Sequence, residues 1–279
     1  MKKTILLLAV AGALALQSCE NNKKGVNVNA EVKEAFTAKY PGAKDVRWNT
    51  RNTYSVAEFK DNGTSASAWF DGAGTWYMTE TDIPYAALPQ TVQAAFKASE
   101  YGAWRVDDVD RIERQGAETV YVIEVEQGTS EADLYYTPDG VLVKTLFDTD
   151  SDDDYEDFIP SQLPETIRAF LDSRYPGWQL IEIDHEKGQT EVEIVQERTA
   201  REVVFDAAGQ WVSTTSDIRR SEVPQAVLQA IAASSYSGYE IDDIELVETP
   251  AGTWYVVELE DEINDREVRL RIDADGTIL

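Results

Sequence analysis

The sequence predicts an α+β protein made of four tandem α-β-β-β-β units, which form two modules of antiparallel sheet with helices packed on one face. The first supporting observation is a long internal repeat. Tyr40-Pro41-Gly42 recurs 135 residues later as Tyr175-Pro176-Gly177, and other motifs recur at the same spacing. These other pairs are Trp76 and Trp211, Asp82-Ile83 and Asp217-Ile218, and Asp107-Asp108 and Asp242-Asp243. So many identities at one ungapped spacing indicate a duplicated block.

Each block is itself a duplication. Similar segments begin at Leu88-Pro89, Leu163-Pro164 and Val223-Pro224, and each continues with apolar residues at helical spacing. Proline suits the first position of a helix, where a backbone N–H has no partner. The first unit lacks this proline and is expected to begin its helix at Asn29, which is a favourable N-cap residue.

Strand signals follow each predicted helix. In the second unit they cover residues 104–114, 119–126, 131–136 and 141–146, and Pro138-Asp139-Gly140 predicts a tight turn between the last two. Alternation along the third strand of each unit places one set of side chains under the helices. The pairs of this set are Ala68/Phe70, Leu134/Tyr136, Val203/Phe205 and Leu270/Ile272. The opposite, open face then carries Trp69 and Tyr135.

These patterns predict the following boundaries. Residues 1–18 are a lipoprotein signal peptide, residues 19–29 a tether, and residues 30–149 the first module, with units 30–82 and 83–149. Residues 150–158 form an acidic linker. Residues 159–279 form the second module, with units 159–217 and 218–279.

The N-terminus reads as an export signal. Lys2 and Lys3 precede an uncharged apolar stretch, residues 5–16, which is too short to span a bilayer as a stable helix. The stretch leads into Leu16-Gln17-Ser18-Cys19, a pattern that resembles the bacterial lipobox. We therefore expect lipidation at Cys19 and a location in the cell envelope of a Gram-negative bacterium, anchored to the outer membrane on its periplasmic face or at the cell surface. The membrane contact is expected through the N-terminal lipid alone.

Composition narrows the possible partners and chemistries. The formal net charge of −27 repels nucleic acid and anionic lipid headgroups and favours basic partners or divalent cations. Cys19 is the single cysteine, so the sequence predicts neither a disulfide framework nor a cysteine nucleophile.

The repeated motifs resemble those of the PepSY-like family of bacterial cell-envelope proteins, whose units are similar to β-lactamase-inhibitor-like folds. The matching segments are Tyr-Pro-Gly after the helix, residues 54–59, 121–125 and 255–259 on the second strands, and the Phe-Asp-x-x-Gly hairpins at Phe70 and Phe205. The resemblance covers essentially the whole mature chain. It implies a concave antiparallel sheet with helices on one face, and a role in binding or inhibiting enzymes by analogy.

The residues do not predict an enzyme or a cofactor. His185 is the one histidine, which leaves nucleophilic catalysis and zinc binding with a single candidate. Asp107-Asp108 and Asp242-Asp243 are adjacent on predicted strands, so the members of each pair are expected to point to opposite faces. An acidic hydrolase therefore stays a weak alternative.

Calcium is the one metal for which the sequence offers candidate ligands. Asp148, Asp150, Asp152 and Asp154 alternate as at the start of an EF-hand loop. The sixth position, however, is Asp153 where the loop needs glycine, and the twelfth is Ile159 where it needs glutamate. These residues are a weak Ca²⁺ candidate beside the simpler interpretation as a solvated linker.

The leading hypothesis is a non-enzymatic binding lipoprotein. It would bind a protein or peptide through the open sheet face. A basic partner and an inhibitory role are two options for this binding. Trp69, Tyr135 and Trp254 are the candidate contact residues, because exposed aromatic side chains concentrate binding energy. Coverage of these rings by one another or by a neighbouring unit is the competing interpretation. A glycan-binding accessory protein that stacks sugars on the same rings is an alternative function.

Overall fold

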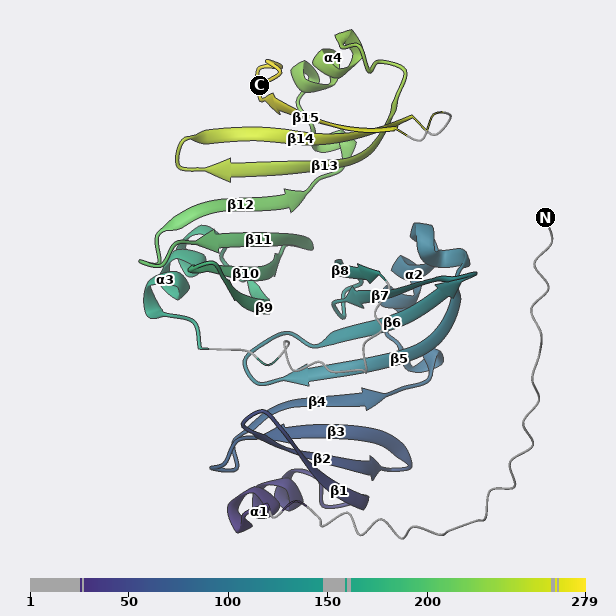
Figure 1. Cartoon of the computed structure of the whole chain (residues 1–279), viewed down its shortest axis with the longest axis vertical. Coiled ribbons are helices and arrows are strands. Elements are labelled where there is room, and N and C mark those ends of the chain that lie inside the picture. The colour runs from purple at the N-terminus through teal and green to yellow at the C-terminus, as the bar shows by residue number, and fades with distance from the viewer. Residues whose placement is uncertain (1–25, 27, 148–158, 160–161, 262–263, 265) are drawn as a thin grey trace, which may run out of the picture.

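The computed structural model describes residues 26, 28–147, 159, 162–261, 264 and 266–279. It contains two antiparallel sheets with strands in sequential order, and four α-helices (Figure 1). The first sheet holds β1 (Lys44–Arg51), β2 (Tyr54–Asp61), β3 (Thr64–Phe70), β4 (Trp76–Asp82), β5 (Arg105–Arg114), β6 (Val120–Gln127), β7 (Ser130–Tyr136) and β8 (Leu142–Phe147). The second holds β9 (Gln179–Glu186), β10 (Gln189–Gln196), β11 (Thr199–Phe205), β12 (Trp211–Asp217), β13 (Glu240–Thr249), β14 (Gly252–Asp261) and β15 (Arg266–Asp273). The helices are α1 (Ala30–Lys39), α2 (Gln90–Ala98), α3 (Glu165–Arg174) and α4 (Gln225–Ala233).

The predicted α+β class and the two modules are confirmed, with one difference in the last unit. Units one to three each contribute four strands, whereas the described part of unit four contributes three. After its hairpin turn, Ile278 forms a bridge with Ile272 of β15. The second sheet therefore has β15 at one edge and β9 at the other.

Helix starts follow the local chemistry that the sequence indicates. The side chain of Asn29 accepts a hydrogen bond from Val32 N at 2.9 Å, as expected for an N-cap. The other three helices begin one residue later than predicted, because Pro89, Pro164 and Pro224 occupy the extended capping position in front of the first helical residue.

Each helix packs against the strands of its own unit and forms a separate core there. The predicted inward-facing pairs of the third strands all contribute to these cores, so the face assignment is confirmed. Phe36 of α1, for example, contacts Phe59 and Phe70 edge-on, with ring centroids 5.0 and 6.2 Å apart. Four small cores on one side of the two sheets leave the opposite faces for other contacts.

The turn before each last strand explains why the Asp-x-x-Gly motif recurs. Oδ1 of Asp206 accepts hydrogen bonds from Ala208 N and Gln210 N, both at 2.9 Å, and the equivalent aspartates of units one and four do the same. The glycine that follows has a positive φ and lies against the helix of its unit. A Cβ on Gly140 would lie 2.5 Å from the carbonyl oxygen of Thr91, so the turn and the helix can approach only where the residue is glycine.

Candidate binding face

Two of the three predicted contact residues do not lie on a free surface. The side chains of Trp69 and Tyr135 are 0% and 3% exposed, so the expectation that they lie on an open face is wrong. They do lie on the sheet face opposite the helices, as the alternation predicts. That face of the first sheet is covered by the second module, and the two rings form part of a fifth core.

The covering element is the corner of the second sheet formed by β9 and β10. Ile181 and Val195, from these strands, pack into the same core as Trp69, Met78 and Tyr135 of the first sheet. Figure 1 shows β9 and β10 close to β7 and β8 of the first sheet. The competing interpretation of the aromatic residues, coverage by a neighbouring unit, is therefore what the structure shows for Trp69 and Tyr135.

Polar contacts surround this joint between the modules. Arg114, which is 5% exposed, donates from Nη1 to the carbonyl oxygen of Ile181 and from Nη2 to that of Glu118, the latter at 2.8 Å. The backbone N–H of Glu118 donates to the carbonyl oxygen of Leu180 at 2.8 Å. Lys144 Nζ of β8 lies 3.0 Å from Glu182 Oε2 of β9. These contacts fix the position of β9 on the first sheet.

Residues at equivalent positions of the two blocks differ in a way that indicates which open face is buried at this joint. At the repeat spacing of 135 residues, Val56, Trp69 and Met78 of the first open face correspond to Glu191, Val204 and Ser213 of the second. The first face is apolar at all three positions and becomes buried, whereas on the second face Glu191 and Ser213 are polar and stay partly exposed. Comparison of equivalent positions in the two blocks is thus the sequence signal that distinguishes the two faces.

Trp254 is the candidate that stays partly accessible. It lies on β14, on the open face of the second sheet, opposite Val247 of β13. The guanidinium carbon of Arg271 lies 3.7 Å from the centroid of its ring, so one side of the ring is already occupied by a cation–π contact. The structure does not bring Trp254 together with Trp69 and Tyr135, which lie in the core between the modules.

Carboxylates form a row across the same open face, and the sequence analysis did not single them out. Glu182, Glu193 and Glu202 lie directly opposite one another on β9, β10 and β11. Farther across, Asp217 of β12 lies opposite Glu245 of β13. Carboxylate oxygens of Asp217, Asp243 and Glu245 lie within 4.8 Å of one another. Like charges directly opposite on neighbouring strands destabilise a sheet, so this row is unfavourable for folding alone.

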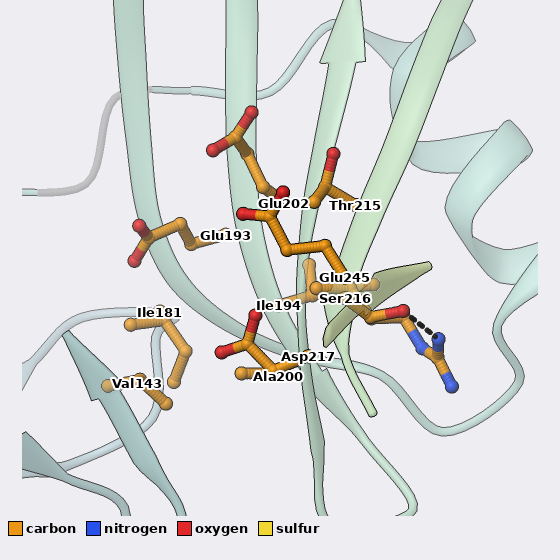
Figure 2. Close-up of a pocket in the computed structure, with 11 residues that line it drawn as sticks. Val143, Ile181, Glu193, Ile194, Ala200, Glu202, Thr215, Ser216, Asp217 and Glu245 are labelled. Carbon is orange, nitrogen blue, oxygen red and sulfur yellow. Dashed lines mark hydrogen bonds between the residues drawn. The ribbon is translucent and has the colours of Figure 1, made fainter. Parts of the chain in front are cut away.

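The row borders two adjoining hollows. The larger, of about 210 Å³, lies between β8 and β11 and is lined by Lys144, Glu182, Asp184, Glu191, Glu193 and Glu202. The other, of about 160 Å³, shares Glu193 and Glu202 and extends to Asp217 and Glu245. Figure 2 shows these four carboxylates around the second hollow, with Val143 and Ile181 at one side. It opens where the ladder between β11 and β12 stops at Glu202 and Thr215.

Burial and mutual repulsion change the acidity of the row. Burial, followed by the charge of Glu182, raises the pKa of Glu193 to about 7, although Lys144 and Arg114 act in the opposite direction. Its Oε2 atom is enclosed and has no hydrogen-bond partner among the described residues. Burial and the neighbouring Asp243 and Asp217 also raise the pKa of Glu245. The face therefore holds poorly compensated negative charge.

The other residues of interest lie elsewhere. His185 is exposed near the end of β9, with Nδ1 3.2 Å from Thr190 Oγ1. Asp107-Asp108 and Asp242-Asp243 each lie at an irregularity in the ladder, between β5 and β6 and between β13 and β14. Cys19 and the calcium candidates Asp148, Asp150, Asp152 and Asp154 lie outside the described residues.

Fold and faces together define a class of protein: a tandem array of helix-covered antiparallel sheets that offers a surface for binding. Residues 52–144 and 191–279 match the family described as "Putative beta-lactamase-inhibitor-like, PepSY-like". The chain belongs to this PepSY-like family, and the resemblance inferred from its motifs is confirmed. The family indicates a non-catalytic binding protein.

Solved structures similar to this chain cover about one module. A DUF2874 family protein from Bacteroides ovatus is 35% identical, with 46% of this chain and 94% of that protein covered and a TM-score of 0.44. A BLIP-like protein from Bacteroides fragilis is 32% identical, with 49% and 93% covered and a TM-score of 0.43. A structure described as "putative periplasmic proteins", from Bacteroides eggerthii, is 26% identical, with 45% and 93% covered and a TM-score of 0.44.

Two further comparisons give negative results. No curated protein matches the chain. Among the described residues, the helices are too short or too polar for any of them to cross a membrane.

Proposed function

We propose that the protein is a non-enzymatic binding lipoprotein of the cell envelope, which binds a protein or peptide through the open face of its second sheet. The observation that carries this proposal is the difference between the two equivalent faces. The first face is apolar and is filled by β9 and β10 of the same chain. The second carries Trp254, partly exposed apolar residues and a row of carboxylates that the fold does not require.

The surface chemistry supports a protein or peptide over a sugar. Val247 and Val256 flank Trp254 on β13 and β14, so an apolar patch lies next to the acidic row. Such a combination of an aromatic residue, aliphatic residues and charge is typical of protein interfaces. Stacking on a sugar would need a free ring, and one side of the Trp254 ring is covered by Arg271. The glycan-binding alternative is therefore less well supported.

Selection from a random peptide library displayed on phage tests the proposal. The immobilised mature protein is expected to enrich peptides whose binding is weakened at least tenfold by Trp254→Ala. Phe147→Ala is the matched control, because Phe147 is 61% exposed on β8 and lies outside the proposed face. Peptides that bind equally well to both variants, or no enrichment at all, would show that this face is not the binding surface. A glycan array read with the same two variants tests the alternative.

The proposed location depends on Cys19. A lipid on the Cys19 thiol would hold the binding face at the outer membrane, separated from it by the polar tether of residues 20–29. Labelling of cells with a radioactive fatty acid should mark the wild-type protein and leave Cys19→Ala unlabelled. Equal labelling of both would exclude this anchor.

A further inference from the structure

We propose that the open face of the second sheet binds a basic, extended segment of a partner protein, whose lysine or arginine side chains enter the two hollows along the carboxylate row. This inference rests on the proposed function and specifies the partner's chemistry. Its support comes from charge complementarity, from the shape of the row and from comparison with the equivalent place in the first module.

The charge of the two hollows is strongly one-sided. Seven carboxylates line them, at Glu182, Asp184, Glu191, Glu193, Glu202, Asp217 and Glu245, against the two cations Lys144 and Arg201. Lys144 is already paired with Glu182 at 3.0 Å. Arg201 donates to Ser216 Oγ at 3.4 Å and lies over the ring of Tyr175 at 5.5 Å. Among the described residues, neither Glu202 nor Glu245 has a salt bridge to a cation of this chain.

The row is too long for a single ion. It runs from Glu182 on β9 to Glu245 on β13, which are four inter-strand steps apart, or roughly 19 Å at the usual strand spacing. A calcium ion needs six to eight oxygens converging at about 2.3–2.6 Å. An extended chain with several separate charges fits a row of this length better. The apolar side chains of Val143, Ile181 and Ala200 in the second hollow suit the methylene stems of lysine or arginine.

The first module provides an internal comparison. A hollow of about 300 Å³ occupies the equivalent place, and its lining includes Glu58 and Asp82, the counterparts of Glu193 and Asp217. There, however, Arg47 replaces Glu182 and Ser67 replaces Glu202, and Lys60 adds a second cation. With Asp45 and Glu80, the hollow of the first module holds four carboxylates and two cations, against seven carboxylates and two cations in the two hollows of the second module. Repulsion across the second sheet costs stability, and a cationic ligand would relieve it.

Binding of synthetic peptides to the mature protein tests the inference. The probes are fluorescent eight-residue peptides that alternate lysine with serine, or glutamate with serine, and the readout is fluorescence anisotropy at low and high salt. We expect the lysine peptide to bind, the glutamate peptide not to bind, and the affinity to fall at least tenfold in high salt, because screening weakens exposed charge pairs.

The decisive comparison uses two double variants with the same loss of charge. Glu202→Gln with Asp217→Asn should weaken lysine-peptide binding at least tenfold. Glu80→Gln with Asp82→Asn, in the equivalent hollow of the first module, should leave it unchanged. The first variant should unfold at an equal or higher denaturant concentration than wild type, because it removes repulsion, so a loss of binding would not reflect misfolding.

Three outcomes of the synthetic-peptide test would overturn the inference. The first is equal binding of the lysine peptide to both double variants, and the second is no binding to either wild type or variants. The third is calcium binding by wild type that Asp217→Asn abolishes, together with no peptide binding, which would indicate an ion site. If library peptides depend on Trp254 but contain no basic residues and ignore Glu202→Gln with Asp217→Asn, the proposed function stands and this inference fails.

Discussion

Arg114, the last residue of β5, donates a hydrogen bond from its buried guanidinium to the carbonyl oxygen of Ile181 on β9. The same side chain also donates to the carbonyl oxygen of Glu118, so one residue joins the two modules through main-chain acceptors. Because these acceptors belong to the backbone, the contact fixes where β9 lies on the first sheet. The joint therefore determines which open face stays available for binding.

Replacement of Arg114 by methionine should destabilise the protein. Each carbonyl that loses its donor in a buried position costs about 1–3 kcal/mol, and Ile181 and Glu118 would both be affected. The measurement is the midpoint of urea unfolding. Arg219→Met is the control, because the side chain of Arg219 is 87% exposed and its contact with Glu222 is 3.7 Å long. An unchanged midpoint for Arg114→Met would show that the joint does not contribute to stability.

Trp69→Ala should lower stability far more than Trp254→Ala. Trp69 is fully buried between the modules, and truncation of a buried large aromatic side chain costs about 3–5 kcal/mol. Trp254 lies on the open face, so its truncation should reduce the free energy of unfolding markedly less. Thermal unfolding of both variants gives the comparison. Equal losses would contradict the burial of Trp69, or the accessibility of Trp254.

Glu193→Gln should stabilise the protein at pH 8 and have little effect at pH 4.5. In the folded protein the pKa of Glu193 is raised to about 7 by burial and by the charges of Glu182 and Glu202, against the opposing charges of Lys144 and Arg114. A raised carboxyl pKa means that the folded state binds the proton more tightly than the unfolded state, so this residue lowers stability as pH rises from about 4.5 to 7.

The expected gain at pH 8 is on the order of 2 kcal/mol, which is lost as the wild-type carboxyl becomes protonated. Urea unfolding at several pH values measures it. Glu197→Gln, at an exposed position in the β10–β11 turn, removes the same charge and serves as the control. A gain that is equal at both pH values would indicate a cause other than titration of Glu193.

Gly140→Ala should destabilise the second unit, and Gly128→Ala should do so much less. Both glycines have a positive φ, of 76° and 66°, so both substitutions carry the same backbone penalty of roughly 1 kcal/mol. Only Gly140 lies against a helix, where the new Cβ would meet the carbonyl oxygen of Thr91 at 2.5 Å. The difference between the two unfolding free energies therefore measures the contact between turn and helix. Equal unfolding free energies for the two variants would exclude a contribution from this contact.

Much of the fold was readable because it depends on interactions within each unit. Asn29 caps α1 through a residue three positions away, and Asp206 organises its turn through residues two and four positions away. The alternation on β3 places Ala68 and Phe70 under α1 whatever the rest of the chain does. Unit four departs from the prediction, because its described part contributes three strands and Ile278 only forms a bridge with Ile272 of β15.

The candidate site was readable only in part. Alternation places Trp254 on the open face, where it is partly exposed, and the same rule places Trp69 and Tyr135 on such a face, although both are buried. Alternation specifies the face of a sheet that a side chain occupies but does not specify what covers that face. No local pattern predicts the carboxylate row, because Glu182, Glu193 and Glu202 are separated in sequence and meet only through strand register.

The sequence by itself determined the four-fold repeat, the helix and turn positions, and the side of each sheet that packs under helices, because these features arise from contacts over a few residues or within one unit. Only the tertiary structure decided that β9 and β10 fill the first open face and that the second face gathers the negative charge. Those outcomes depend on packing and register between segments far apart in the chain, where no local pattern records which surfaces meet.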